Sequence, residues 1–139
     1  MLHNAVERNQ QRFSVDALRR FIEGATRLRA EGIGWVPLVA YLEHTPGVLT
    51  TLDEDLLEPL LKTASALHAR AGERAVDQFF SLLALVARHF AERNMFAGYL
   101  ELLQEVATLA PQALAPIFDH LPQLLEHLSI VGLTKWARM

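Results

Sequence analysis

Six histidines in a chain of 139 residues raise the question of a metal site. The best pair is His120 and His127, seven residues apart and adjacent to Asp119 and Glu126. Pro122 lies between the two histidines and interrupts the helix that would bring them to one face. Two imidazoles with one added carboxylate make only an open, weak zinc site. We therefore predict no resident metal and interpret these histidines as solvated or hydrogen-bonded surface residues.

Residues for other catalytic chemistry are equally sparse. The chain contains no cysteine, which excludes a thiol nucleophile, a disulfide framework and an iron–sulfur centre. Neither a Gly-x-Ser-x-Gly elbow nor a glycine-rich phosphate loop occurs. The carboxylates of Asp53–Asp55 and Glu58 cluster where a helix is expected to begin, and there they complement the helix dipole. We predict a chain that is not an enzyme and that binds no cofactor.

Aromatic side chains are the remaining candidates for function, in binding rather than in catalysis. Trp35 and Tyr41 flank an expected short helix, and Trp136 stands close to Leu133 in the last segment. Exposed Trp and Tyr residues are favoured anchors at protein interfaces. Aromatic residues at helical spacing also fit a buried core, and that alternative stays open. Trp35, Tyr41, Leu133 and Trp136 are therefore the candidate protein-interaction residues.

Composition limits the partners and the compartment. Hydrophobic residues make up 51% of the chain and charged residues 21%, with a net charge of −3. No clustered basic run is present, so a nucleic-acid partner is not expected. The longest apolar run, Phe79–Ala87, is too short for a membrane span, which needs about 20 residues. We expect a cytoplasmic protein, because the N-terminus also lacks the apolar core of a signal peptide.

Helical periodicity runs through almost the whole chain, which predicts an all-α fold. The expected elements are a helix from a Ser14 cap to Gly32, a short helix opened by Gly34–Pro37 that ends within Glu43–Gly47, and an element capped by Thr51 or Asp53 that is kinked at Pro59 or divided there into two shorter helices. A central helix from Glu73 with an apolar stripe from Val76 to Phe90 and a helix from Arg93 to Ala110 follow. Beyond them we expect short helices at Pro111, Pro116 and Pro122, or one kinked rod.

Short antiparallel helices joined by tight turns favour a right-handed stack of the HEAT or armadillo kind, an α-solenoid. A compact helical bundle is the alternative, because no clean sequence repeat of about 40 residues is visible.

The last segment predicts one more helix that is cut short. Ser129 is a suitable N-cap, and Ile130, Leu133 and Trp136 recur at helical spacing up to Met139. A helix of about two turns has little stability alone, so its apolar face needs more protein to pack against. We expect residues 1–139 to form a single helical domain, the N-terminal fragment of a longer chain. Residues 1–12 are expected to be a poorly ordered or loosely packed start.

Several segments resemble the N-terminal helical region of a bacterial family of von Willebrand A-domain proteins. This family comprises the accessory proteins for nitric oxide reductase activation and for the rubisco activase of chemoautotrophs. The resemblance spans roughly residues 15–139. The similar segments are Gly32–Leu42 followed by Thr45–Pro46, Tyr99–Leu103 leading to Leu109–Pro111, His120–Leu128, and Gly132–Ala137.

The resemblance implies an adaptor role. In that family a von Willebrand A domain follows the helical region, and the protein works with a hexameric AAA+ ATPase of the MoxR type. The resemblance therefore implies that this chain is a non-catalytic scaffold that docks on the ATPase, and that the missing C-terminal part reaches the target enzyme. We favour rubisco as that target. The alternatives are the same role in nitric oxide reductase activation, or an unrelated helical-repeat interaction module.

Overall fold

The computed structural model describes residues 14–127, and within this range it is helical and contains no strand. The all-α prediction is confirmed. The helices are α2 (Val15–Ala30), α3 (Trp35–Thr51), α4 (Leu57–Ala71), α5 (Glu73–Ser81), α6 (Leu83–His89), α7 (Arg93–Leu109) and α8 (Leu114–His127), with short 3₁₀ turns η1 (Glu54–Leu56) and η2 (Pro111–Ala113). Between Ser14 and His127, no helix combines the length and the apolar character needed to cross a bilayer.

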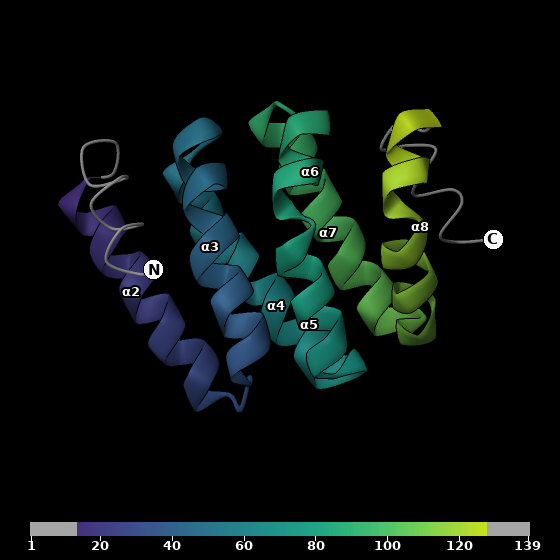
Figure 1. The fold of residues 1–139 in the computed structure, drawn as a ribbon, viewed down its shortest axis with the longest axis horizontal. Helices are drawn as coiled ribbons and strands as arrows, with labels where there is room; N and C mark the ends of the chain where they lie inside the picture. The colour runs from purple at the N-terminus through teal and green to yellow at the C-terminus, as the bar shows by residue number, and fades with distance from the viewer. Residues whose placement is uncertain (1–13, 128–139) are drawn as a thin grey trace.

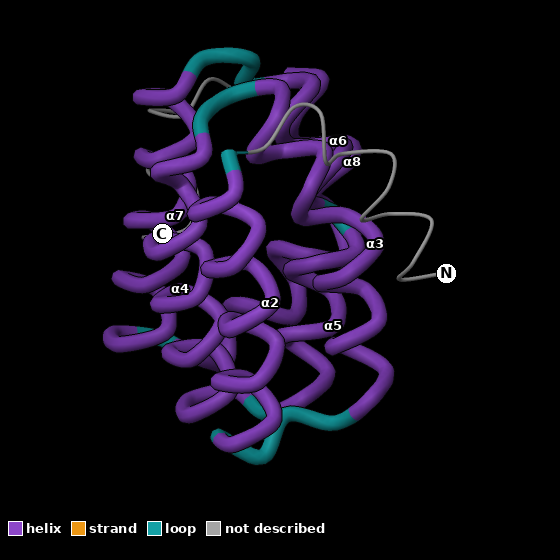
Figure 2. The backbone as a smooth tube through the Cα atoms, turned by 90° about the vertical axis from the view of Figure 1, so that its left-hand side faces the viewer, coloured by secondary structure: helices purple, strands orange, loops and turns teal. Residues whose placement is uncertain are grey.

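The helices form two layers, seen edge-on in Figure 2. One layer holds α2, α4 and α7, and the other holds α3, α5 with α6, and α8. Consecutive helices pair across the layers, so the described residues fold as three successive hairpins: α2 with α3, α4 with α5 and α6, and α7 with α8. Figure 1 shows the chain progressing from one end of this stack to the other.

Four of the polar contacts between neighbouring hairpins share one sequence separation, and the Arg27–Glu58 pair, 31 residues apart, does not. In the described part of the chain, four pairs of residues 40 or 41 positions apart are joined by side-chain hydrogen bonds or ion pairs of 2.9–3.0 Å: Ser14 with Glu54, Asp53 with Arg93, Thr63 with Gln104, and Gln78 with Asp119. The chain therefore advances by one hairpin about every 40 residues, although the paired residue types differ each time.

Helix ends follow the predicted punctuation. The Ser14 hydroxyl accepts a hydrogen bond from the N–H of Ala17, which satisfies one of the unpaired donors at the start of α2. Gly32 and Gly72 adopt φ values of 91° and 89°, in the region that favours glycine. Asp53, one of the two expected caps, accepts from the N–H of Asp55.

The prolines interrupt the helices less than predicted. The expectation of a short second helix is wrong, because α3 continues through Pro46 to Thr51. Pro46 is buried, and the Thr50 hydroxyl donates to its carbonyl. Pro59 lies in the first turn of α4, and the helix continues past it to Ala71. Pro122 lies inside the single helix α8, where successive short helices were one expectation.

The predicted central helix is divided. Residue Leu82 separates α5 from α6, although the backbone ladder continues through it from Gln78 to Val86. The apolar stripe predicted from Val76 to Phe90 is nevertheless buried throughout. The burial pattern was therefore predicted correctly, and the helix continuity was not.

The joint between the first two hairpins is built around Tyr41. Its hydroxyl donates to the carbonyl of Phe21 at 2.6 Å, and the two rings stack with centroids 5.0 Å apart. Phe80 of α5 meets the Tyr41 ring edge-on at 5.3 Å. Gly24 makes room for the hydroxyl, since a Cβ at Gly24 would stand 2.5 Å from it and 3.2 Å from Leu61 of α4.

Two glycines within helices provide a matched test of this joint. Alanine is favoured over glycine in a helix by about 1 kcal/mol. At Gly47 a Cβ would meet no atom of the described part of the chain within 4 Å, so Gly47→Ala should raise the free energy of unfolding by a few tenths to about 1 kcal/mol. Gly24→Ala should instead lower it by about 1–3 kcal/mol, because the methyl group overpacks the Tyr41 contact. Urea unfolding followed by circular dichroism measures both. Stabilisation by Gly24→Ala would contradict the close packing.

Candidate functional site

The residues considered for a metal site do not converge. Among residues 14–127, no three His, Asp or Glu side chains lie where they could hold an ion together. His120 is exposed on α8, and the neighbouring Asp119 accepts a hydrogen bond from Gln78 of α5. His127 ends α8. At Asp119, α8 therefore contacts α5 of the second hairpin.

The acidic cluster at the start of α4 connects hairpins. Asp53 pairs with Arg93 of α7 at 2.9 Å, and Glu54 accepts from the backbone N–H of Ser14. Glu58 forms an ion pair with Arg27 of α2 at 3.1 Å. These carboxylates bind chain groups on neighbouring helices, in addition to lying at a positive helix end.

Exposed apolar side chains gather at the two ends of the stack. In residues 14–127, the large hydrophobic residues with substantial exposure are Val15, Ile22, Trp35, Val36 and Val39 of the first hairpin and Met95 and Leu109 of α7. The second hairpin, which has a neighbour on each side, contributes none of them. The ends of the stack are thus the surfaces on which apolar contact area remains open.

The outer side of α3 carries the largest of these groups. Trp35 and Val36 are 66% and 67% exposed, and Val39 is 40% exposed. Exposed positions continue at four-residue spacing to Glu43, Gly47 and Thr51, and because each step turns about 40° past a full turn they form a stripe that winds around α3. We call Trp35, Val36, Val39, Glu43, Gly47 and Thr51 the α3 stripe. Glu43 is its one charged member.

Trp35 is held in place despite its exposure. The guanidinium of Arg29, in the last turn of α2, lies 4.6 Å from the centre of the indole ring. A cation over the face of a tryptophan contributes about 0.5–1 kcal/mol at an exposed site. Arg29 also donates to the carbonyl of Ile33 at 2.9 Å, which fixes the guanidinium to the turn. An aromatic anchor that is ordered before binding loses less conformational entropy when a partner arrives.

The α3 stripe runs into a groove between α3 and α6. This α3–α6 groove has a volume of about 370 Å³, and its apolar walls are formed by small side chains. It is lined by His44, Gly47, Val48, Thr51, Ala84, Ala87, Arg88 and Ala91. Because Gly47 and Thr51 belong to both features, the stripe and the groove form one continuous surface across the first two hairpins.

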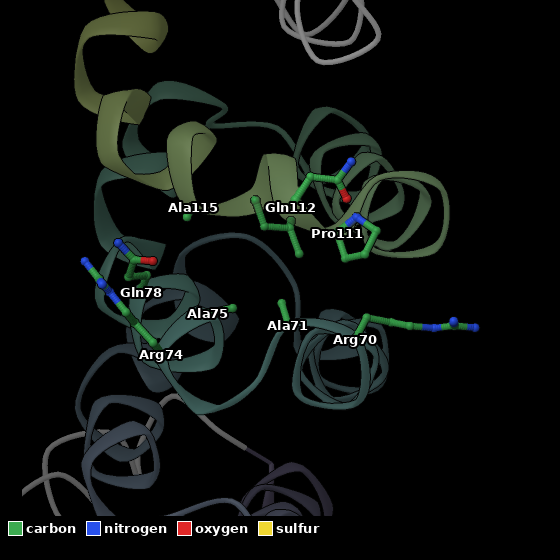
Figure 3. Close-up of a pocket in the computed structure, with 9 residues that line it drawn as sticks. Arg70, Ala71, Arg74, Ala75, Gln78, Pro111, Gln112 and Ala115 are labelled. Carbon is green, nitrogen blue, oxygen red and sulfur yellow. The ribbon is translucent and has the colours of Figure 1, made fainter.

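A second pocket, of about 400 Å³, lies where α4, α5 and α8 meet (Figure 3). Its two arginines, Arg70 and Arg74, extend away from its centre on opposite sides in Figure 3. Gln78 at its edge is engaged with Asp119. The pocket therefore lacks the convergent polar groups that orient a small ligand.

The candidate interaction residues separate into three groups. Trp35 is exposed at the surface described above, whereas Tyr41 is fully buried and is a core residue in this structure. Leu133 and Trp136 lie outside the described residues. Sequence reasoning missed Val36 and Val39, although the four-residue step from Trp35 to Val39 was the available signal.

Comparison with known proteins yields no match, either to a protein-family model, to a curated protein or to a solved structure. Functional interpretation therefore depends on the residues and surfaces of this chain.

The two tyrosines differ in one respect that can be measured. Tyr41 donates to Phe21, whereas the buried hydroxyl of Tyr99 has no hydrogen-bond partner among residues 14–127. Tyr41→Phe should lower the free energy of unfolding by about 0.5–1.5 kcal/mol, the usual net value of such a bond. Tyr99→Phe should leave it unchanged or raise it, because an unsatisfied buried hydroxyl is removed. Equal destabilisation by both substitutions, in chemical denaturation, would contradict this assignment.

Burial also makes both tyrosines sensitive to alkaline pH. Desolvation raises the pKa of the Tyr41 and Tyr99 hydroxyls above the ordinary value of about 10. The folded protein thus holds these protons more tightly than the unfolded chain, so the stability they confer is present below about pH 10 and declines as the pH rises further. Tyrosinate absorbance should appear only as the protein unfolds. Titration of native protein near pH 10, like that of the urea-unfolded chain, would refute this.

Proposed function

We propose that this chain is a non-catalytic adaptor domain built as a HEAT- or armadillo-like α-solenoid, and that it docks on a hexameric AAA+ ATPase of the MoxR type. In this proposal the chain lies in the cytoplasm and is part of a von Willebrand A-type rubisco activase. The α3 stripe is the observation that carries the docking proposal.

The solenoid assignment is supported by the repeat of contacts. The second hairpin packs against the first through α2–α4 and α3–α5, and against the third through α4–α7 and α5–α8. Stacked repeats bury their faces against their neighbours, so a terminal repeat that lacks a polar capping face leaves apolar side chains exposed. The exposed apolar residues of α2, α3 and α7 follow this distribution. A compact bundle would place them with no relation to the order of the hairpins.

The docking role is supported by the chemistry of the α3 stripe. Interface anchors are enriched in tryptophan and are surrounded by contacts that exclude water. Trp35 is ordered by Arg29, and Val36 and Val39 extend its apolar area along α3. The adjoining α3–α6 groove is mostly apolar, with three alanines beside His44 and Arg88 in its lining, which suits an inserted helix or hydrophobic side chain.

The identity of the ATPase comes from the resemblance described above. The same surface serves the alternative role in nitric oxide reductase activation, because both branches use a MoxR-type hexamer. An unrelated helical-repeat interaction module would use such a stripe for a different protein.

Binding of the full chain to the purified hexamer tests the proposal. Isothermal titration calorimetry should detect a complex, and Trp35→Ala or Val39→Glu should weaken it by about tenfold or more, the usual effect of losing an interface anchor. Leu109→Ala is the matched control, because Leu109 is also apolar and exposed but lies on α7. It should leave the affinity unchanged.

Different outcomes test the ATPase as partner and the α3 stripe as binding surface. No complex with wild-type chain would refute the ATPase as partner. A complex that Trp35→Ala and Val39→Glu leave intact would refute the α3 stripe as the contact. Circular dichroism of each variant establishes that the helices are retained.

A further inference from the structure

The α3–α6 groove is built from equivalent positions of the first two hairpins. Its walls pair residues 40 positions apart, a separation that also joins the hairpins through polar contacts: His44 with Ala84, Gly47 with Ala87, and Thr51 with Ala91. Because this register is constant along the groove, its two walls run parallel. The groove is therefore a product of how the hairpins stack.

Short side chains keep this groove open. Ala84 and Ala91 are exposed, and a Cβ at Gly47 would meet no atom of residues 14–127 within 4 Å. A cavity of about 150 Å³ holds one benzene ring, so the 370 Å³ of the groove has room for roughly two aliphatic side chains. From His44 to Thr51 the groove follows α3 for about 10 Å, which is close to two helical turns.

Arg88 gives the groove its charge. This exposed residue has no ion-pair or hydrogen-bond partner in the described part of the chain. His44, the other basic residue of the lining, lies 4.0 Å from the carboxylate of Glu43. The lining itself contains no carboxylate within the described residues. A partner with an acidic side chain beside its apolar ones is thus complementary to the groove, and it would form a charge-assisted hydrogen bond with Arg88.

The groove and Trp35 face different directions. Nine residues separate Trp35 from His44, and at 100° per residue this places the two on opposite sides of α3. A straight helix that packs on Trp35 therefore leaves the groove accessible to a second segment.

We infer that the α3–α6 groove binds about two turns of an amphipathic helix from a partner protein, with two aliphatic side chains between its walls and a carboxylate on Arg88. Residues four apart share a helix face, so the two aliphatic residues would be spaced in this way. The inference rests on the docking part of the proposed function, because the groove adjoins the α3 stripe. It names the chemistry of the docked segment and does not require the ATPase as its source.

A synthetic peptide tests the inference with the full chain. The probe is a fluorescein-labelled, alanine-based helical peptide with two leucines four residues apart and one glutamate beside them on the same face. Fluorescence anisotropy should show saturable binding. Gly47→Leu, which fills the groove, should weaken binding about fivefold or more, whereas the matched variant Gly47→Ala should change it less than twofold.

A charge exchange tests the contact with Arg88. Arg88→Glu should weaken binding of the glutamate peptide about fivefold and strengthen binding of a peptide with lysine in its place, because the pair changes from attraction to repulsion and back. Arg74→Glu is the control, since Arg74 is an exposed arginine of α5 outside this groove, and it should leave both affinities unchanged.

Several results would overturn the inference. These are no saturable binding up to about 1 mM peptide, binding that Gly47→Leu and Arg88→Glu leave intact, or a dimer of the chain that Gly47→Leu dissociates in analytical ultracentrifugation. The last would identify a second copy as the occupant.

Trp35→Ala distinguishes this inference from the proposed partner. It should weaken the complex with the ATPase and leave peptide binding unchanged. Peptide binding without an ATPase complex would refute the partner alone, and an ATPase complex without peptide binding would refute the groove alone.

Discussion

The buried hydrogen bond from Tyr41 to the carbonyl of Phe21 sets the geometry on which the rest of the fold depends. It requires α2 and α3 to approach closely at Gly24, where Leu61 of α4 also packs, and Phe80 of α5 meets the Tyr41 ring. Because Tyr41 must face inward, the rotation of α3 about its axis is fixed. At about 100° per residue, Val39 and Val36 then point away from the core. The exposed stripe is therefore a consequence of the buried tyrosine.

Stability and register come from different interactions in this protein. Most of the favourable free energy must come from the apolar residues buried between the layers, as in other small domains. The contacts 40 or 41 residues apart are polar and mostly exposed, and pairs of this kind each contribute about 0–1 kcal/mol. Their directionality suits them to fixing how one hairpin sits on the next, which non-directional apolar packing specifies poorly.

Local signals in the sequence were sufficient to predict that the fold is helical and where several helices end. A Ser14 cap or a glycine with positive φ acts within a few residues of the chain. Continuity through Pro46 and Pro122 could not be predicted, since a lost backbone bond is offset by packing against residues distant in sequence. The repeat of about 40 residues was invisible because equivalent positions carry different chemistry, serine with glutamate in one place and threonine with glutamine in another. For the candidate site, Trp35 was identified by residue type. Its neighbours Val36 and Val39 required knowledge of which way Tyr41 faces.

Arg29 adds a positive charge to the surface around Trp35, so this anchor can select partners by their charge as well as by their shape. One face of the indole is already occupied by a guanidinium, so a partner can meet only the other face and the edges of the ring. A lysine or arginine arriving there would meet a positive charge within a few ångströms, whereas an aliphatic side chain or a carboxylate at the rim would not. Specific surfaces commonly reject wrong partners through such repulsion as well as attracting the right one. Arg29 at the end of α2 thus selects partners by charge at the Trp35 end of the surface, whose other charged residues are Glu43 and Arg88.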